Sequence, residues 1–520
     1  MSGFHPFGHT FGAGGSAYGA SSSPEDIRAI LPIASGETVQ VGDVGEVRKG
    51  KVFKSFQSLV TTKSAGDLGI GTVDSVYQLP VIAAIDEKRA LMLITRWYAA
   101  TSKYFLEAFI ITDNGTSVSV KPFTNIIDMT GVNPSYADLT ELDTGKFLFT
   151  YKDFQDSKYK GRVFEVVGDT VTLQNSFDIS PGSVGNEYVS TCRLAKDKVL
   201  VSYNDIVRVL VFNGYSPTYY PEYDFMYDTQ NTYICQERKL VAIDENHVVL
   251  YFTVNSTGSP FQMKPIKIND DLTCYTNLAS TGGSMDGGYG YRYFGYGNTA
   301  VAFDGNKTAI LAASSSTDKN TSVTLFVTEA TNDGMTLTGK VVYYQVSSGT
   351  KIGSLAYIGK DSEGAYYFSA HFFAASTAYA RIIRVAADYT QNTTPVMFTD
   401  VQVGTDAGAI ASCNLDARRL ICVSWYATGK KMYVSLHDTR LAMPDGVITQ
   451  AVQGGANAEI QMMGVVRGLD SLQPGASYYG GADGELKTIP VSTTSVTAEL
   501  NKLGAALSPT DLFIPNYKKR

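Results

Sequence analysis

The sequence has little of what metal sites, disulfide scaffolds and nucleic-acid binders depend on. Its 520 residues include 5 cysteines, 5 histidines and 2 tryptophans, and only 18% of them are charged. The formal net charge of −7 argues against the basic surface that a nucleic-acid binder needs. No stretch approaches about 18 consecutive apolar residues, so no membrane span is expected. The first residues show neither a basic nor an apolar signal-peptide region, so no signal peptide is expected.

The five cysteines show no spacing that is typical of a metal or redox motif. Their number is odd, and no two of them form a Cys-x-x-Cys pair. We expect free thiols that are buried as small apolar side chains, in a protein that assembles in a reducing compartment. They are Cys192, Cys235, Cys274, Cys413 and Cys422.

Aromatic residues and glycine, in contrast, are abundant. The chain contains 33 Tyr, 25 Phe and 49 Gly. Tyr, Phe, Thr and Val favour the pleated, half-buried surface of a sheet, and glycine allows tight turns. The composition therefore predicts an all-β protein. The length suits one large repeat domain with appendages.

A short pattern returns seven times along the chain. An apolar stretch ends in a polar turn, usually containing Asp, and a second apolar run follows at once, as in AIDEKRALMLI. The first and last copies are six repeats and 330 residues apart, which gives a mean period of 55 residues. A fixed period of this length indicates a repeat architecture. The turns contain Asp86, Asp143, Asp197, Asp244, Asp304, Asp361 and Asp416.

Each repeat reads as four short antiparallel strands. In the first repeat, apolar or alternating runs at 81–85, 90–98, 103–112 and 117–123 are separated by polar turns. Four antiparallel strands per unit, with little helix between units, are typical of a propeller blade. The sequence therefore predicts a seven-bladed β-propeller with four-stranded blades. A β-sandwich array and a β-solenoid are the alternatives, although solenoid coils are usually shorter and no linkers for an array are visible.

The flanks of the repeats differ from them in composition. Residues 1–23 are rich in glycine and serine, so we expect a flexible leader that becomes ordered only against a partner. Residues 24–55 read as a small β meander, preceded by one helical turn with Ser23 as its N-cap. The propeller is predicted over 56–450 and a small C-terminal β module over 451–520. The two flanks are expected to pack into one domain, because neither can bury a core alone.

Three stretches in these flanks resemble a small β module of tailed-phage virion proteins. They are IASGETVQVGDVGEVRKGKV from Ile33, GLDSLQPGASYYGGADGELKT from Gly468, and GAALSPTDLFI from Gly504. The resemblance lies in Ala-Ser-Gly followed by Gly-Asp-Val, in Leu-x-Pro-Gly-x-x-Tyr-Tyr, and in Gly-x-Ala-Leu-Ser-x-Thr-x-Leu. Each motif alone is modestly specific, and the three in order around a repeat domain are more so.

The resemblance implies a non-enzymatic virion structural protein of the tail-fibre or tail-associated kind. It would attach by its terminal module and present the propeller to the host surface, for receptor binding or for decoration. The implied partners are other virion proteins of the tail, baseplate or head, a host-surface glycan or protein, and further copies of the chain in a homo-oligomer. The implied location is the virion, after assembly in the host cytoplasm.

Two other functional classes compete with this interpretation. One is a polysaccharide-degrading propeller hydrolase of the virion, either a depolymerase or sialidase-like, which would need several acids with perturbed pKa values in one pocket. The other is a cellular scaffolding propeller. The sequence lacks the Gly-His and Trp-Asp signature of the Trp-Asp repeat family, which disfavours that class.

No motif for catalysis or cofactor binding stands out in the sequence. Sialidase-type Asp boxes, a GxSxG elbow and DxDxDG metal loops are absent from it. The repeated Asp residues are expected to cap their own turns. His5 and His9 stand in a glycine-rich segment without a helix signal. No catalytic residue, metal or cofactor is therefore predicted.

Two tyrosine-rich segments are the candidate binding sites. They span 215–227 and 289–296 and are expected to be long loops between blades. A tyrosine ring offers a flat apolar face and a hydroxyl, which suits stacking on a sugar or docking on a protein. Packing between blades is the competing interpretation. The candidate residues are Tyr215, Tyr219, Tyr220, Tyr223, Tyr289, Tyr291, Tyr293, Phe294 and Tyr296.

Overall fold

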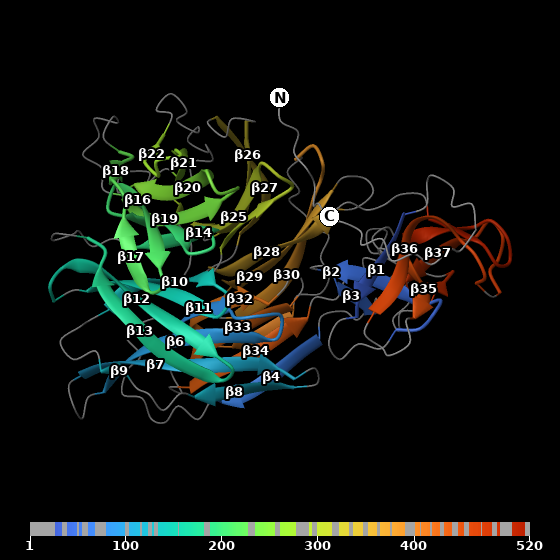
Figure 1. Cartoon of the computed structure of the whole chain (residues 1–520), viewed down its shortest axis with the longest axis horizontal. Helices are drawn as coiled ribbons and strands as arrows, with labels where there is room; N and C mark the ends of the chain where they lie inside the picture. Colours follow the sequence, from blue (N-terminus) through green and yellow to red (C-terminus); the bar gives the residue numbers. More distant parts are fainter. Residues whose placement is uncertain are drawn as a thin grey trace. The chain divides into compact units, whose positions relative to one another are not determined.

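The computed structural model of the chain divides into two compact units (Figure 1). Unit 1 comprises Met1–Ser55, Met443–Pro490 and Lys502–Tyr517, and unit 2 comprises Phe56–Ala442, Val491–Asn501 and Lys518–Arg520. The structure describes residues 27–33, 39–48, 51–54, 61–67, 80–98, 103–114, 117–122, 127–128, 134–153, 155–180, 188–226, 235–254, 261–276, 291–293, 299–314, 322–331, 336–346, 352–360, 365–374, 377–389, 401–405, 407–415, 419–426, 431–438, 446–451, 457–469, 471–480, 486–488 and 502–514.

All regular secondary structure in these ranges is β-strand, which confirms the all-β prediction. The described part of the chain accordingly has no helix with the length and apolarity that a membrane crossing requires. The leader predicted at residues 1–23 lies outside the described residues.

Seven antiparallel sheets make up the described part of unit 2. Sheet 1 contains β5 (Val81–Ala84), β6 (Arg89–Tyr98), β7 (Lys103–Asp113), β8 (Val118–Pro122) and β9 (Ile127–Asp128). Sheet 2 contains β10 (Pro134–Asp143), β11 (Lys146–Asp153), β12 (Lys158–Val167) and β13 (Thr170–Asp178). Sheet 3 contains β14 (Ser190–Ala195), β15 (Lys198–Tyr203), β16 (Ile206–Asn213), β17 (Ser216–Tyr219) and β18 (Tyr223–Asp224).

The remaining four sheets follow in chain order. Sheet 4 contains β19 (Cys235–Ala242), β20 (His247–Val254), β21 (Phe261–Ile268) and β22 (Cys274–Tyr275). Sheet 5 contains β23 (Tyr291–Tyr293), β24 (Ala300–Phe303), β25 (Lys307–Ser314), β26 (Ser322–Ala330) and β27 (Leu337–Val346). Sheet 6 contains β28 (Ile352–Lys360), β29 (Tyr366–Ala374), β30 (Thr377–Val385) and β31 (Val401–Thr405). Sheet 7 contains β32 (Ala407–Asn414), β33 (Arg419–Tyr426), β34 (Lys431–Asp438) and β4 (Thr61–Asp67).

The sheets share one four-strand pattern. Sheets 1, 3 and 5 contain five strands, but in each of them two short strands pair with the same neighbour. Strands β8 and β9 both pair with β7, β17 and β18 with β16, and β23 and β24 with β25. Each of these sheets therefore has one divided strand, and the fold of unit 2 is propeller-like.

The first strands of the seven sheets contact one another in a closed order. Strand β5 contacts β10, and the contacts continue through β14, β19, β24, β28 and β32 back to β5. Apolar clusters lie between consecutive sheets, including one that joins sheet 7 to sheet 1 through residues such as Ile421 and Ile94. The core of unit 2 is therefore a set of layers between sheets.

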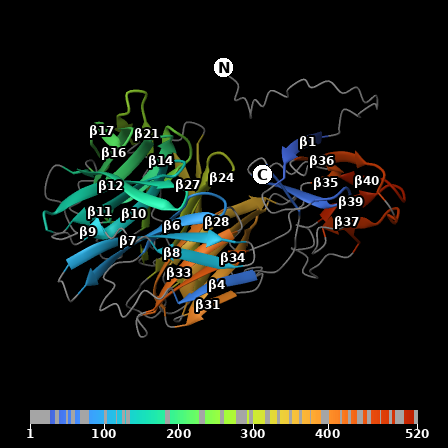
Figure 2. The same cartoon turned by 60° about the horizontal axis from the view of Figure 1, so that its bottom comes forward.

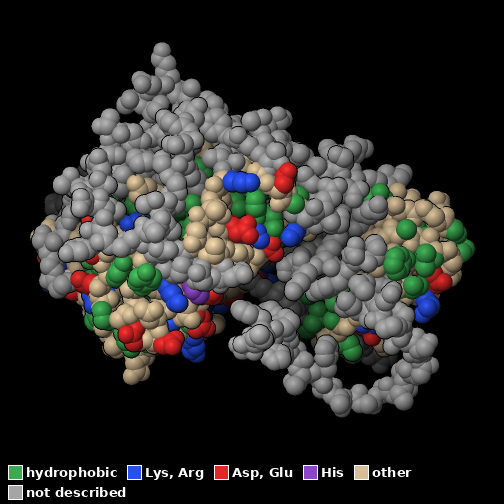
Figure 3. All heavy atoms as spheres, turned by 90° about the horizontal axis from the view of Figure 1, so that it is seen from above, with side chains coloured by type: hydrophobic (Ala, Val, Ile, Leu, Met, Phe, Trp, Pro, Cys, Tyr) green, Lys and Arg blue, Asp and Glu red, His purple; other side chains and the backbone are tan. Residues whose placement is uncertain are grey.

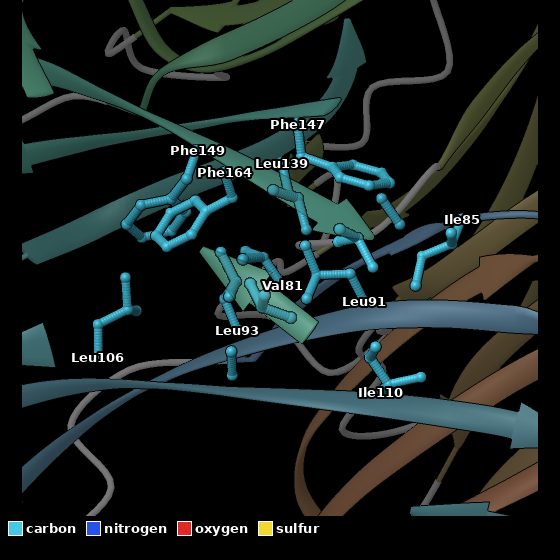
Figure 4. Packing of buried hydrophobic residues seen from close by; sticks show 14 of the residues in the cluster. Val81, Ile85, Leu91, Leu93, Leu106, Ile110, Leu139, Phe147, Phe149 and Phe164 are labelled. Atoms are coloured by element: carbon cyan, nitrogen blue, oxygen red, sulfur yellow. The ribbon is translucent and has the colours of Figure 1, made fainter. Parts of the chain in front are cut away.

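This layering explains why the second strands are continuous apolar runs. Neighbouring sheets cover both faces of such a strand, and in β11 and β15 every residue except the first is buried. Between sheets 1 and 2, Phe147, Phe149 and Phe164 pack in one cluster with Leu91 and Leu93 (Figure 4). The outer strand β13 instead alternates between more and less exposed positions.

Sheet 7 takes its outer strand from the N-terminal side of the chain. Strand β4 pairs antiparallel with β34, and Thr61 lies opposite Asp438. Blue β4 lies beside orange β34 in both Figure 1 and Figure 2. The sequence interpretation did not assign a strand to residues 61–67, because the repeat pattern begins only at residue 81. Backbone pairing thus joins the segment before the first repeat to the last repeat.

Unit 1 interleaves strands from the two flanks. From the N-terminal side come β1 (Ile27–Pro32), β2 (Val44–Arg48) and β3 (Lys51–Lys54). From the C-terminal side come β35 (Gly446–Ala451), β36 (Asn457–Val466), β37 (Ser477–Gly480), β38 (Leu486–Lys487), β39 (Lys502–Ala506) and β40 (Leu512–Ile514). The strand order is β3-β2-β35-β36-β40-β39-β37-β38, with β1 also paired to β36.

One sequence-based expectation for these flanks falls mainly outside the described residues, and another is wrong. The helical turn expected after Ser23 begins on residues 24–26, which are not described, and the next residues, Ile27–Pro32, form the strand β1. Its Ala29 and Leu31 pack on a cluster around Ile460, while alternate positions are exposed, and this two-residue period overrides the local helix signal. Residues 446–450, which the repeat pattern assigned to the propeller, begin β35 of unit 1.

Candidate functional site

Four of the six described tyrosines of the two predicted loops lie in strands, so the loop prediction is wrong for these four, while Tyr215 lies in a turn and Tyr220 outside the strands. Tyr219 belongs to β17 and Tyr223 to β18, which complete sheet 3. Tyr291 and Tyr293 belong to β23, which pairs with β25. The high strand propensity of tyrosine outweighs the nearby glycine and proline turn signals. Outside the described residues lie Tyr227, Tyr289, Phe294 and Tyr296.

Tyr219 lies at the contact between sheets 2 and 3. Its ring meets the Phe177 ring edge-on, with 6.4 Å between centroids, and its hydroxyl donates a hydrogen bond to the Asp178 carbonyl oxygen at 2.7 Å. The Arg208 guanidinium lies 5.1 Å from the ring centroid, within cation–π range. The residue is still 40% exposed. One side chain therefore combines inter-sheet packing with an accessible aromatic edge.

The other described tyrosines of this segment are also engaged. Tyr215 lies with its ring centroid 5.6 Å from Lys146 Nζ, and a hydrogen bond with Glu165 raises the pKa of its hydroxyl. Tyr220 and Tyr223 pack on the apolar cluster between sheets 3 and 4. These contacts favour the packing interpretation for the rings but do not test binding by the exposed edges.

Replacing Tyr219 with alanine is expected to lower the free energy of unfolding by about 1–3 kcal/mol, because an aromatic contact and a hydrogen bond between sheets are lost together. Tyr219→Phe removes only the hydrogen bond and should cost about 0.5–1.5 kcal/mol. The matched control is Tyr275→Ala on β22, where the ring is 50% exposed. Denaturant unfolding of the three variants measures this order. Equal effects of Tyr219→Ala and Tyr275→Ala would contradict the inter-sheet role.

The five described Asp turns lie between the first and second strands of their sheets, where the repeat pattern placed them. Asp86 Oδ1 accepts hydrogen bonds from the backbone N–H groups of Lys88 at 2.8 Å and Arg89 at 2.9 Å. Asp244 Oδ1 caps the backbone N–H groups two and three residues on in the same way. The repeats at Asp361 and Asp416 lie outside the described residues.

The expectation that every Asp caps its own turn is wrong for Asp197 and Asp304, whose carboxylates bind neighbouring sheets. Asp197 accepts from Lys146 Nζ of sheet 2 at 2.6 Å, and Asp304 from the Tyr366 hydroxyl of sheet 6 at 2.6 Å. Both backbones are in the left-handed region, with φ of 56° and 46°. Although burial raises it, the bonds from Tyr366 and Lys307 hold the pKa of Asp304 below its usual value. These Asp residues therefore join sheets.

A cavity of about 380 Å³ lies among the first strands of the sheets in unit 2. Strands β5, β10, β14, β19, β24 and β32 all contribute to its wall. Much of the wall is alanine, leucine and valine. The polar side chains on it are Thr140, Glu141, Thr191, Arg193, Lys239 and Asn414.

A buried carboxylate organises one side of this cavity. Asp138 Oδ2 accepts hydrogen bonds from the Thr191 backbone N–H at 2.8 Å and from its hydroxyl at 3.1 Å, while Oδ1 accepts from the Leu139 N–H at 3.0 Å. The hydroxyls of Thr140 and Thr191 are hydrogen-bonded to each other. These bonds fix the first strands of sheets 2 and 3 side by side.

Three charged side chains on the wall define its electrostatics. Arg193 pairs with Glu141 through an N–O contact of 2.9 Å, with each side chain about one-third exposed. Lys239 Nζ lies 3.7 Å from Asp138 Oδ1, and its side chain is only 11% exposed. Sequence reasoning missed these residues. The available signal was that charged side chains such as Glu141, Arg193 and Lys239 recur on the first strands of three consecutive sheets.

Elsewhere in the described part of the chain, charged side chains of both signs share the surface. On the face seen in Figure 3, the described acidic and basic side chains are interspersed. The described residues include no group of three or more His, Cys, Asp or Glu side chains placed to hold a metal ion.

Comparison with known proteins gives structural neighbours only. No protein family profile matches the chain, and no curated protein resembles it in sequence. A solved protein from Lactobacillus plantarum is 12% identical, with a TM-score of 0.41, over 69% of this chain and 98% of its own. An α-L-arabinofuranosidase of Fusarium graminearum, solved with arabinobiose, is 11% identical, with a TM-score of 0.37, over 59% and 94%. The Nup133 β-propeller domain of Vanderwaltozyma polyspora is 11% identical, with a TM-score of 0.37, over 69% and 99%.

Proposed function

We propose that the chain is a non-enzymatic structural protein of a tailed-phage virion, of the tail-fibre or tail-associated kind. Unit 1 attaches it to other virion proteins of the tail, baseplate or head. Unit 2 is a seven-bladed propeller presented to the host surface, where it recognises a glycan or protein or decorates the particle. The protein assembles in the host cytoplasm and is a homo-oligomer within the virion.

One observation carries this proposal: the three stretches that resemble the phage module meet in one apolar cluster. Val44 comes from the first stretch, Leu472 and Tyr478 from the second, and Ala506 and Leu512 from the third. Residues more than 400 positions apart in the sequence therefore share one core. The motifs act as one folded module, as an attachment domain requires.

The seven-bladed interpretation of unit 2 is supported by three features of the described residues. Seven sheets follow the seven repeats, their first strands contact one another in a closed order, and β4 completes the sheet of the last repeat. Closure of this kind leaves each sheet packed between two others and removes the exposed ends that an open array would have.

The composition of the cavity supports a non-enzymatic role. Among its described lining residues, Glu141 is the one carboxylate, and it is paired with Arg193. Glycoside hydrolysis in most families needs two carboxyl groups that flank the scissile bond.

The described cysteines support assembly in a reducing compartment. Cys192, Cys274, Cys413 and Cys422 are buried, and none of these four is part of a disulfide. Burial raises the pKa of Cys192 and of Cys274 to about 12, which keeps both as unreactive thiols at neutral pH. The expectation of buried apolar thiols is met for these four.

Attachment through unit 1 can be tested on its exposed apolar side chains. Ile30, Val41 and Leu507 are 63%, 61% and 58% exposed, and replacing all three with aspartate should leave the fold intact. If they dock on a virion protein, incorporation into particles should fall about 30-fold or more, as expected for a loss of 2 kcal/mol or more at an interface. The matched control is Val167→Asp in unit 2, at a valine that is 68% exposed.

Incorporation is measured by immunoblotting of purified particles from hosts that supply the variant while the phage copy of the gene is disrupted. A triple variant that is folded and incorporated like the control would refute attachment through these side chains. Release of sugar from host envelope by the purified protein would instead establish the hydrolase alternative.

A further inference from the structure

We propose that the cavity among the first strands of unit 2 binds a small carboxylate-bearing sugar or a related polyhydroxy acid. Its volume of about 380 Å³ falls within the range of small-molecule pockets, about 300–1,000 Å³. The inference rests on unused hydrogen-bonding groups of its wall and is independent of where the protein resides.

The first of these groups is the ammonium of Lys239. Its 3.7 Å separation from Asp138 Oδ1 exceeds a hydrogen bond, and the Asp138 oxygens already accept bonds from Leu139 and Thr191. Three N–H donors of a side chain that is only 11% exposed therefore have no hydrogen-bond acceptor among the described residues. Burying an ammonium group without hydrogen-bond acceptors costs free energy. An anionic ligand would supply the acceptors.

Arg193 adds a second cationic group to the same wall. Its one ion pair among the described residues, with Glu141 Oε2, leaves most of the N–H donors of the guanidinium without an acceptor there. The lining contains two cationic residues, Lys239 and Arg193, and one anionic residue, Glu141, so its net charge is +1. A carboxylate is the complementary ligand group, because it accepts from both cations and matches the planar guanidinium.

Asn414 of β32 requires a hydrogen-bond donor on the ligand, whereas the two cations require an acceptor. Its Nδ2 donates to the Leu355 carbonyl oxygen at 3.3 Å, which fixes the orientation of the amide. Asn414 lines the cavity, and its Oδ1 is buried without a hydrogen-bond partner among the described residues. An unsatisfied buried acceptor is destabilising, and a ligand hydroxyl would satisfy it. The ligand must therefore combine an anion with hydroxyl donors.

The rest of the wall fits a compact ring. Ala83 and Ala84 on one strand and Ala300 and Ala302 on another replace the larger side chains that would fill the space. Small apolar residues beside a few polar groups suit the faces of a sugar ring and its substituents. Phosphate or sulfate would satisfy the cations but would leave Asn414 Oδ1 without a donor.

Calorimetric titration of the full chain with D-glucuronate, D-glucose and acetate tests the proposal. Glucuronate is expected to bind at least about tenfold more tightly than either of the other two, because it alone offers both a carboxylate and hydroxyls. Glucose binding as tightly as glucuronate, or acetate doing so, would overturn the proposal. The proposal would also be overturned if none of the three compounds gave a heat of binding at millimolar concentration.

Two variants locate the binding. Lys239→Met keeps the length of the side chain and removes its charge, so glucuronate should lose its advantage over glucose. Arg193→Gln, at a partly exposed residue, serves if the first variant unfolds. The control is Lys196→Met, because Lys196 is 70% exposed, pairs with Asp143 and is not part of the wall. Undiminished glucuronate binding by folded Lys239→Met or Arg193→Gln would place the ligand elsewhere and overturn the assignment.

A second titration identifies the source of the acid. A tetrasaccharide of alternating glucuronate and N-acetylglucosamine should bind more tightly than glucuronate alone if the natural ligand is a polysaccharide. It should bind more weakly if the ligand is a free sugar acid enclosed by the cavity. Lys239→Met should weaken the preferred compound in either case.

Discussion

Replacing Arg419 with methionine is expected to lower the free energy of unfolding of unit 2 by about 3–5 kcal/mol. The guanidinium joins the last repeat to the first, with one nitrogen 3.0 Å from Asp113 Oδ2 and another donating to the Glu87 carbonyl oxygen at 2.7 Å. The two side chains are only 13% and 4% exposed. Removing one partner of a buried pair leaves the other charge buried and uncompensated, and this accounts for the large cost.

The matched control for Arg419→Met is Lys196→Met, because Lys196 and Asp143 form a pair between sheets 2 and 3 that is largely exposed. An exposed pair contributes about 0–1 kcal/mol, so this variant should unfold at nearly the same denaturant concentration as the unaltered protein. A double-mutant cycle with Asp113→Asn isolates the pairwise energy. Equal midpoints for Arg419→Met and Lys196→Met would show that the pair does not stabilise closure of the ring.

Replacing Gly504 with alanine is expected to disrupt unit 1 while leaving unit 2 folded. Gly504 lies in β39, and a methyl group there would overlap the Phe513 carbonyl oxygen of the adjacent strand β40. Because that obstacle is backbone in a small module, we expect a cost of about 3 kcal/mol, at the upper end of the range for overpacking. Scanning calorimetry should show that unit 1 unfolds at a lower temperature than in the unaltered protein, while the unfolding temperature of unit 2 is unchanged.

Leu507→Ala is the control for Gly504→Ala, because Leu507 lies in the same motif and is 58% exposed. Its effect should stay within about 0.5 kcal/mol. Loss of particle incorporation by Gly504→Ala, with normal incorporation of the Val167→Asp control in unit 2, would tie the fold of the module to attachment. An alanine at position 504 with no effect on the module would mean that β39 and β40 separate at no cost.

The regular part of the fold was predictable because its signals are local. Each repeat begins with an apolar strand, a turn containing Asp and a second apolar strand, as in β5, Asp86 and β6. These three signals lie next to one another in the sequence. Five described copies of the turn stand where the pattern placed them. The all-β class followed from the same composition that fills the second strands with buried apolar residues.

The features that the sequence did not reveal depend on pairing between distant segments. Strand β4 is defined by its partner β34, some 370 residues later, and β1 by its partner β36. Tyr219 reads as part of a loop until the neighbouring Phe177 and Asp178 are in place. The strand propensity of a short segment does not reveal which distant segment it pairs with in the folded protein.

The candidate site was hidden for the same reason. Asp138, Arg193 and Lys239 are separated by about 50 residues each and meet only because the first strands of successive sheets adjoin. In the sequence, Asp138 and Arg193 stand among other polar residues and Lys239 directly follows two charged residues, so none of the three stands out. All three lie on the first strands of their sheets. An alignment of the repeats with one another would have shown this shared position and could have indicated a common cavity.

The pairing of β4 with β34 also has a mechanical consequence. Two of the passages between the units run through residues 55–60 and 439–445, and they reach sheet 7 at Thr61 and Asp438, which lie opposite each other. A pull transmitted along the chain from unit 1 is therefore shared by two adjacent strands at the same end of one sheet. Asp438 also lies opposite Arg419 on β33. The load continues through Arg419 to Asp113 of sheet 1, so tension spreads into the ring across the contact that closes it.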